Sequence, residues 1–487
     1  MQEQKEEHLH RSLGLLDATM LVSGSMIGSG IFIVSADMGR LTGSTGWLLF
    51  LWLLSGAITL MAALCYGELA GMMPKAGGQF VYIQRAWGNM LSFLYGWTVF
   101  TVIQTGVIAA VAVAFAKYTA VFFPVFSVDN ILLDVAGLKI SAAQLLAIVL
   151  IAFLSYFNSR GIEGGKKIQT FFTSTKLIAL FFLIVVGLYY GLKTDVITQN
   201  FQNAWHAEQL TKTDSGWVSE HITGFALILV LGTAIIGSLF SSDAWNNVTF
   251  IAGEIKDPRK NIPRSLLLGT GIVTVLYFLA NISYLSLLPL KGNANATDVI
   301  GQGIQFAGGG TDRVGTAAAS MIFGDTSVYI MAALIMLSTF GCNNGIILSG
   351  ARVYYAMAKE GLFFKKAEQL NNKGVPGYAL TIQAIWASIL CLSGTYGDLL
   401  DYTTFASLLF YVITIAGLFI LRTKEPQAER PYKVIGYPLL PLLYIIIASA
   451  ICLILLYTKT SVTGKGLFIV LLGLPVYLLI NGKKQNT

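Results

Sequence analysis

The sequence predicts an all-α membrane protein with twelve transmembrane helices, of which the first and the sixth are broken near their centres. Of the 487 residues, 55% are hydrophobic and 12% are charged, whereas a soluble domain has about 25% charged residues. Mean hydropathy is +0.68. Twelve segments approach the roughly 20 apolar residues that a spanning helix needs. Two of them contain polar or glycine-rich sequence, at residues 24–32 and 240–246.

The twelve segments follow one another along almost the whole chain. The ninth and twelfth are short and the third is long, which indicates tilted helices or misplaced ends. The predicted helices span residues 13–38, 46–72, 90–121, 141–157, 169–192, 223–252, 265–288, 328–358, 378–392, 399–421, 437–457 and 467–480.

An even number of helices places both termini on one side of the membrane, and the distribution of positive charge predicts which side. Most of the 32 Lys and Arg residues lie at the termini or after even-numbered helices, so we expect these regions to be cytoplasmic. The excess of Lys and Arg in these cytoplasmic regions accounts for the net charge of +7. The net charge therefore gives no reason to expect nucleic-acid binding. The predicted organisation is a cytoplasmic tail (1–12), a single membrane domain (13–481) in the cell membrane, and a second cytoplasmic tail (482–487).

The positions of the cysteine and histidine residues do not predict a metal site, a bound cofactor or redox chemistry. The four Cys residues all fall in apolar segments and form no C-x-x-C pair, which is typical of buried free thiols. The four His residues lie in the N-terminal tail and in one loop. No membrane-embedded pair of nucleophile and base is visible, so we do not expect an enzyme. The polar residues in the spans are also too few for the continuous path of a channel.

The first break lies at Gly28-Ser29-Gly30. Gly24 and Gly28 form a G-x-x-x-G pattern, which can serve helix packing alone. Two glycines around a serine also free the backbone to unwind. A half-helix that starts there would direct free N–H groups at an anion. Unwound backbone at this depth must line a protein-walled cavity.

The second break, at residues 240–246, contains Asp243, a carboxylate deep inside a predicted span. Such a residue is by default a candidate for function, although Asp243 could equally cap the half-helix that follows. Phe240 and Trp245 would form aromatic walls beside it. Matching breaks in the two halves of a membrane protein predict a binding site at the midplane, as in secondary transporters.

Lys176 lies inside the fifth predicted helix. A lysine at a helix centre costs about 2.5–3.5 kcal/mol on insertion scales, so it needs a partner. One interpretation is that its long side chain reaches out to the near membrane surface. The other is a fixed cation that bridges helix 5 to broken helix 1, where other transporters hold a sodium ion. The mixed-charge connections around Glu68 and at 253–264 are expected to be solvated joints.

Taken together, the motifs resemble the amino acid–polyamine–organocation superfamily, most closely the branch of the L-type amino acid transporters and their bacterial relatives. They run in order across residues 13–430. The matching segments are 24–32, 67–69, 74–78, 171–176, 240–246, 254–264, 340–345 with Arg352, and 358–361.

The resemblance implies a leucine-transporter-type fold in which helices 1–5 and 6–10 are inverted repeats. It also implies roles for individual residues. The substrate carboxylate would meet N–H groups of Gly28, Ser29 and Gly30, and the substrate ammonium would meet carbonyls near Ile27 and at Phe240, Ser241 and Ser242. Phe240 would be the external gate. Lys176 would replace the sodium ion. The remaining pocket residues would be Val102, Ile103 and Gly106 on helix 3 and Asp243 on helix 6.

The expected function is sodium-independent transport of small to medium neutral L-amino acids, by exchange, through alternating access. Proton-coupled import and transport of cationic amino acids or polyamines remain open, with an amino-acid sensor as a distant alternative. Ser242 stands where several relatives have Tyr, which would enlarge the pocket or make it more polar. Gln79 replaces a frequent Glu outside the pocket. Residues 117–140 contain no Cys, so no covalent heavy-chain partner is expected.

Overall fold

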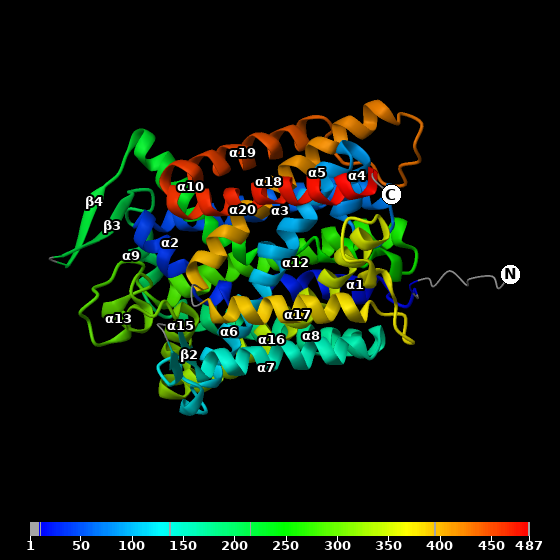
Figure 1. Cartoon of the computed structure of the whole chain (residues 1–487). Helices are drawn as coiled ribbons and strands as arrows, with labels where there is room; N and C mark the ends of the chain where they lie inside the picture. Colours follow the sequence, from blue (N-terminus) through cyan, green and yellow to red (C-terminus); the bar gives the residue numbers. More distant parts are fainter. Residues whose placement is uncertain (1–8, 10, 136–137, 215, 394–395, 486–487) are drawn as a thin grey trace.

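A computed structural model describes residues 9, 11–135, 138–214, 216–393 and 396–485. Most of the predicted N-terminal tail lies outside these residues. The long helices form one bundle, and the segments next to both chain ends lie at the same end of it (Figure 1). We call this the terminal end. The opposite end carries two β-hairpins, and we call it the hairpin end.

The first predicted helices are confirmed, with helix 1 broken. They are, for helix 1, α1 (Leu15–Met26), η1 (Gly30–Phe32) and α2 (Ser35–Thr42); for helix 2, α3 (Thr45–Met72); for helix 3, α5 (Asn89–Thr98), η2 (Val99–Ile103) and α6 (Gln104–Thr119); for helix 4, α7 (Ala142–Ser159); and for helix 5, α8 (Ile162–Gly191).

The later helices follow the prediction in the same way, with helix 6 broken. They are, for helix 6, α10 (Gly224–Ser241), α11 (Asn247–Phe250) and η4 (Ala252–Glu254), and then α12 (Pro258–Leu287), α16 (Ser327–Lys359), α17 (Gly377–Leu392), α18 (Tyr396–Lys424), α19 (Leu439–Thr458) and α20 (Thr460–Gln485).

Short elements occupy the connections. They are α4 (Gln79–Trp87), η3 (Pro124–Phe126), the hairpin of β1 (Ile131–Val135) and β2 (Leu138–Ser141), α9 (Val196–Phe201), the hairpin of β3 (Glu208–Thr213) and β4 (Gly216–His221), α13 (Val299–Gln302), α14 (Ala307–Gly310), α15 (Val314–Phe323), η5 (Gly324–Thr326) and η6 (Lys365–Glu368).

Three predicted helix starts lie well inside the helices of the structure. Helix 5 begins at Ile162 rather than at 169, helix 7 begins at Pro258 rather than at 265, and helix 12 begins at Thr460 rather than at 467. Hydropathy finds only the apolar part of a helix, whereas the first turns here are polar. In helix 5 the polar first turn makes a contact with helix 1, because Lys166 forms an ion pair of 3.0 Å with Asp17 on α1.

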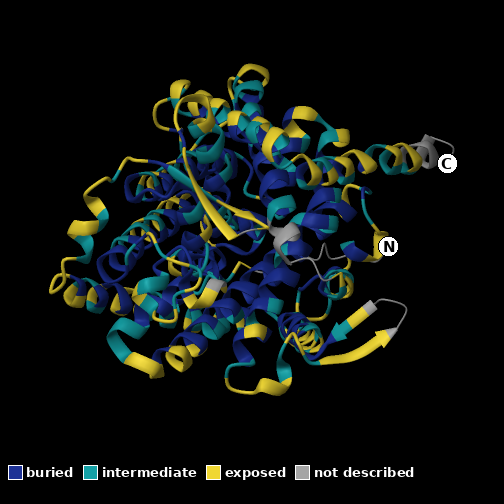
Figure 2. Cartoon of the chain, turned by 90° about the vertical axis from the view of Figure 1, so that its left-hand side faces the viewer, coloured by how far each residue is buried: buried dark blue, intermediate teal, exposed yellow. Residues whose placement is uncertain are grey.

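The outer faces of the helices suit a bilayer. Among the described residues, ten helices are long and apolar enough to cross a membrane, and α1 and α17 are shorter apolar helices. Buried residues concentrate on the inner faces of the helices (Figure 2). On α8, the large apolar side chains of Phe171, Ile178 and Phe181 point outward, with Ile178 69% exposed. Apolar surface on this scale indicates a lipid-facing belt.

The two halves of the chain pack through equivalent helices. Helix α12 lies along α3, and α16 lies along α6, so helix 7 contacts helix 2 and helix 8 contacts helix 3. The two broken helices also meet directly. A Cβ at Gly30 would lie 3.0 Å from Cβ and 3.3 Å from Cα of Ser241, and closer still to its Oγ. Only glycine allows this approach.

The hairpin end is held together by an ion pair. Arg40 on α2 donates through Nη1 and Nη2 to Asp312 at 2.5 and 2.9 Å, and through Nη1 to the carbonyl of Gln305 at 2.7 Å. These bonds connect the second half of helix 1 to the connection before α15. The first turn of α3 also contacts the connection that precedes the second hairpin, because the Gly46 N–H donates to the carbonyl of Ala204 at 2.7 Å.

We expect Gly30→Ala to destabilise the fold more than Gly28→Ala. The added methyl at position 30 must displace Ser241, including its backbone, whereas at position 28 the nearest atom is Cys342 Sγ at 3.6 Å. Overpacking of this kind costs about 1–3 kcal/mol. Apparent melting temperatures in detergent measure the difference. Equal melting temperatures for the two variants would contradict the close approach of helices 1 and 6.

Candidate functional site

The break in helix 1 is filled by a lysine. Nζ of Lys176, on α8, donates to the carbonyls of Gly24 and Ile27 at 2.6 Å each and to the carbonyl of Ser338 at 3.3 Å. The residue is 1% exposed. Because α1 ends at Met26 and Ile27 is extended, carbonyls around the break point away from the helix ladder. The ammonium supplies the donors that this unwound backbone lacks.

This geometry decides between the two interpretations of Lys176. A lysine that reached out to the membrane surface would expose its ammonium, whereas Nζ is buried among three carbonyl oxygens. These oxygens come from helix 1 and helix 8 and form a cage that would suit a hard cation. Lys176 therefore stands as a fixed cation between helices 1, 5 and 8.

Two residues of helix 8 complete the contacts of this break. Ser338 Oγ lies 2.9 Å from the carbonyl of Ile27 and 3.0 Å from that of Gly28. Cys342 Sγ donates to the carbonyl of Ser25 at 3.0 Å. Ser338, Cys342 and Lys176 thus hold α1 in place without a regular helix end.

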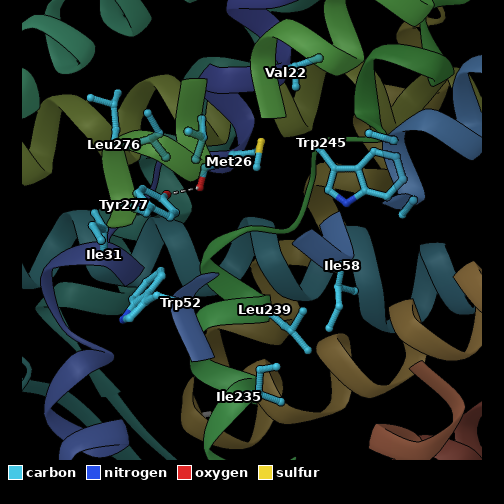
Figure 3. Packing of buried hydrophobic residues seen from close by; sticks show 14 of the residues in the cluster. Val22, Met26, Ile31, Trp52, Ile58, Ile235, Leu239, Trp245, Leu276 and Tyr277 are labelled. Atoms are coloured by element: carbon cyan, nitrogen blue, oxygen red, sulfur yellow. Dashed lines mark hydrogen bonds between the residues drawn. The ribbon is translucent and has the colours of Figure 1, made fainter. Parts of the chain in front are cut away.

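A tyrosine joins the two breaks to each other. The hydroxyl of Tyr277, on α12, lies 3.1 Å from the carbonyl of Met26 and 3.1 Å from that of Ser241. Figure 3 shows the ring beside Trp52 with the hydroxyl directed at Met26. A phenol has one proton, so it donates to one of these two carbonyls at a time. Tyr277 therefore ties helix 6 to helix 1 at the level of both breaks.

The other side of the helix 1 break presents free donors. The backbone N–H groups of Ser29, Gly30 and Ile31 have no acceptor among the described residues, although all three residues are buried. Buried N–H groups are almost always paired. The break therefore leaves three consecutive backbone donors of the described chain unpaired around the start of η1.

The break in helix 6 brings Asp243 to the centre of the bundle. Helix α10 ends at Ser241, α11 begins at Asn247, and Ala244 between them has a φ of 64°. This left-handed backbone is uncommon for a residue with a Cβ and clusters at functional sites. Asp243 Oδ1 accepts a hydrogen bond from Tyr411 of α18 at 2.5 Å. Asn246, not Asp243, is the N-cap of α11, so the capping interpretation is wrong.

Beside this break lies a cavity lined by both polar and apolar side chains. Of the predicted substrate-binding residues, only Asp243 and Ile103 are in its lining. Those that do not line it are Ile27, Gly28, Ser29, Gly30, Val102, Gly106, Phe240, Ser241 and Ser242. The five residues of η2 form a π-helical turn in helix 3, a feature often found at functional sites, and two of them face the cavity. The lining residues are Gln79, Tyr95, Val99, Ile103, Gln104, Val107, Asp243, Ala244, Asn246, Asn247, Phe250, Ile346, Ser407 and Tyr411.

Amide side chains connect the cavity wall to its neighbours. Gln104 Nε2 donates to Oδ1 of Asn247 at 3.2 Å and to the carbonyl of Ile346 at 2.8 Å. Asn246 Nδ2 donates to Oε1 of Gln79 at 3.0 Å. These bonds connect helix 6 to helix 3 and to α4, and they connect helix 3 to helix 8.

The two predicted aromatic walls, Phe240 and Trp245, differ in burial. Trp245 is 2% exposed and packs edge-on against Tyr66 at 4.8 Å between ring centroids, with Tyr411 at 5.2 Å. It lines a second cavity, which it shares with Ser242 and Asp243. Phe240 is half-buried in the last turn of α10, and its role as a gate stays a prediction.

Two buried ion pairs close the terminal end, and here the expectation of solvated joints is wrong. Arg352 donates to both carboxylate oxygens of Glu254, at 2.8 and 3.1 Å, and the two side chains are 0% and 1% exposed. The carbonyl of Glu254 also accepts the N–H groups of Ser12 and Leu13. Helix 8, the end of helix 6 and the segment before α1 therefore meet at one residue.

Glu68 forms the second of these pairs. Its side chain is fully buried, and it accepts two hydrogen bonds from Arg422, at 2.6 and 2.9 Å, and one from the N–H of Val434 at 2.7 Å. Arg430 Nε lies 3.3 Å away. Glu68 and Arg352 are charged residues inside predicted spans. This unusual position could have identified them as buried partners from the sequence alone. Tyr277, Ser338, Tyr95 and Asn247 gave no such signal, because their partners are distant in sequence.

Comparison with known proteins agrees with this architecture. A family model described as "Amino acid permease" matches residues 13–480. The chain belongs to the amino acid permease family. It is 28% identical over 478 residues to the Asc-type amino acid transporter 1 of Mus musculus, which covers 97% of this chain and 81% of that protein.

Other relatives of this permease cover similar lengths. The large neutral amino acids transporter small subunit 2 of Homo sapiens is 29% identical over 476 residues, which is 97% of this chain and 80% of the relative. The b(0,+)-type amino acid transporter 1 of Mus musculus is 29% identical over 439 residues, 89% of this chain and 80% of the relative. The permease is thus a membrane transporter with a leucine-transporter-type arrangement of helices, and not an enzyme.

We expect Glu254→Gln to destabilise the permease strongly. Removal of one partner leaves the Arg352 guanidinium buried and unpaired, which costs about 3–5 kcal/mol. The apparent melting temperature in detergent should fall by roughly 5 °C or more. The control is Glu429→Gln, which breaks an exposed pair with Arg259 and should cost about 0–1 kcal/mol. Equal effects of the two variants would contradict the role of the buried pair.

Proposed function

We propose that this permease exchanges amino acids across the cell membrane by alternating access, without sodium. The observation that carries the proposal is the position of Lys176. Its ammonium fills a cage of carbonyls from helices 1 and 8, so a metal cation would have to compete with a charged group that is covalently part of the chain. Family membership supports amino acids as the substrates.

The two breaks supply groups for both charges of an amino acid. We assign the carboxylate to the free N–H groups of Ser29, Gly30 and Ile31, since three donors there lack acceptors. The predicted donor at Gly28 is wrong, because that N–H already donates to the carbonyl of Met26 at 3.0 Å. The ammonium is assigned to carbonyls of helix 6. The predicted contact at Ile27 is disfavoured, because that carbonyl already lies within hydrogen-bond distance of Lys176 and Ser338. Tyr277 likewise contacts the carbonyl of Ser241, which leaves Ser242 as the more open acceptor.

We favour neutral amino acids as substrates. The names of the Asc-type and large neutral amino acid relatives support this class. The second candidate is a cationic amino acid or a polyamine, and Asp243 in the cavity wall favours it. Proton-coupled import is an alternative to exchange, with Lys176 as the group that would gain and lose the proton.

We also propose a topology and a subunit state. The terminal end is cytoplasmic, because the positive charge of the connections gathers there. No covalent heavy chain is attached, although the name of one relative describes a small subunit. Support for this comes from the cysteines: Cys65, Cys342, Cys391 and Cys452 are all buried in helices of the bundle.

Uptake into sodium-free proteoliposomes tests the proposed function. Labelled serine, alanine and leucine are offered outside, with millimolar amino acid inside or with empty vesicles. We expect uptake that requires the internal amino acid. Uptake into empty vesicles that grows with an inward proton gradient would replace exchange by proton coupling. Competition by arginine or putrescine would move the substrate class to cations.

Replacement of Lys176 by Met should abolish exchange while the protein stays folded. Methionine fills the space but leaves the carbonyls of Gly24 and Ile27 without the donor that holds the break. We expect at least about a hundredfold loss of turnover, since misplacement of binding groups by about 1 Å can cost as much. Lys166→Met is the control, because Lys166 forms only a partly exposed pair with Asp17. Normal exchange by the Lys176 variant would refute its role.

A further inference from the structure

The connection between helices 3 and 4 exposes a run of large apolar side chains. They follow one another closely in sequence, and each is 38–59% exposed. They include Phe122, Phe123, Val125, Ile131, Leu132 and Leu133. A contiguous apolar surface of this kind marks contact with a membrane or with another apolar partner.

The β1–β2 hairpin in this connection has two chemically different faces. Leu133 of β1 lies opposite Ile140 of β2, and the next residue, Asp134, lies opposite Lys139. Successive side chains of a strand point to opposite faces, so the apolar pair and the charged pair lie on opposite sides of the hairpin. Lys139 Nζ and Asp134 Oδ2 are 3.9 Å apart, and both side chains stay more than half exposed. One face of the hairpin therefore suits water, and the other suits an apolar phase.

The hairpin projects to the side of the bundle. Seen from the hairpin end, β1–β2 extends outward from the edge of the bundle, whereas β3–β4 lies over its middle (Figure 2). In Figure 1, β2 lies beside the first turn of α7, and β3 and β4 extend away from the helix ends. Ser141 is both the last residue of β2 and the N-cap of α7. The hairpin is therefore at the level where a membrane-spanning helix begins.

The apolar surface of the connection continues onto the spanning helices. On α7, Leu145, Val149 and Phe153 are 43–61% exposed, and their spacing of four residues places them on one outward face. In the first turn of α16, Tyr329 is 56% exposed, and its ring centroid lies 5.8 Å from that of Phe122. Aromatic residues are enriched where a membrane meets water. The exposed surface of the connection thus adjoins the lipid-facing belt.

We propose that the β1–β2 hairpin is a membrane-surface anchor, with its Leu133 face in the boundary between lipid headgroups and acyl chains and its charged face toward water. The partner is a neutral lipid surface, because Asp134 and Lys139 balance each other and require no anionic headgroup. The anchor would hold the ends of helices 3 and 4 at the membrane surface. The inference needs only that the chain spans a membrane, and it is independent of which substrate is carried.

The second hairpin provides the contrast at the same end of the bundle. β3–β4 carries Glu208, Lys212 and Glu220 and lies over the middle of the bundle rather than at its edge (Figure 2). Its position and its charges suit water. The two hairpins therefore differ in the surroundings that they fit, although both are two-stranded and antiparallel.

Spin labels on the full permease test the anchor. Leu133→Cys places a nitroxide on the apolar face and Lys139→Cys places one on the charged face, since the native Cys residues are buried. Phosphatidylcholine nanodiscs that hold one permease each exclude contact with a second copy. Collisions with oxygen, which concentrates in lipid, and with a nickel chelate, which stays in water, measure depth. We expect the label at position 133 about 5–10 Å into the headgroup and acyl boundary and the label at position 139 in water.

Val218→Cys is the matched control. Val218 is an apolar strand residue on β4 with 41% exposure, close to the 48% of Leu133, so the two labels differ mainly in the hairpin that carries them. The label at position 218 should collide freely with the nickel chelate. Leu132→Cys is a second labelling site in the anchor, for use where Leu133→Cys lowers the melting temperature.

Each remaining outcome would overturn the anchor. Labels at positions 132 and 133 that are as accessible to nickel as the label at position 218 would place the hairpin in water. Rare collisions with both probes would place the apolar face against protein. Shielding from nickel in liposomes but not in single-copy nanodiscs would assign that face to a second copy of the chain. None of these results bears on the exchange of amino acids, so the proposed function would stand.

Discussion

The arrangement depends on one requirement: unwound backbone inside a membrane needs a hydrogen-bond partner for every polar group. Lys176 meets this requirement at the break of helix 1, with Ser338 and Cys342 beside it. The carbonyls of the break thus receive donors from helices 5 and 8. The N–H groups that follow the break are left free for a ligand. A charged side chain of the chain itself therefore makes possible the local unwinding that a binding site at the midplane needs.

The second break is held by packing and by shared contacts. Gly30 lets helix 1 approach Ser241, and Tyr277 contacts carbonyls of both breaks. At the terminal end, Glu254 joins helices 6 and 8 and the segment before α1. A movement that parts helix 8 from the end of helix 6 would separate the buried charges of Glu254 and Arg352. Such a separation is costly unless water reaches both groups, which makes this pair a natural barrier to opening.

Local sequence was sufficient for the helices and for the breaks. Apolar runs predicted the spans, and the glycines at 28 and 30 predicted the first break, because both signals reside in neighbouring residues. Lys176 and Asp243 stood out because charge is rare in a span. The cavity wall could not be predicted in this way. Tyr95 and Asn247 are ordinary polar residues in sequence, and only tertiary packing brings them together. Helix 5 was predicted too short for a related reason, since its polar first turn pairs with Asp17.

The central claim is that the Lys176 ammonium holds the unwound segment of helix 1. Hydrogen–deuterium exchange of a peptide covering residues 24–32 tests it most directly, in the wild type and in Lys176→Met. The account predicts that amides of this segment exchange at least about tenfold faster in the variant, because local opening becomes easier once the carbonyls lose their donor. Peptides of α19, on the periphery, should be unaffected. Identical exchange of residues 24–32 in the two proteins would contradict the claim.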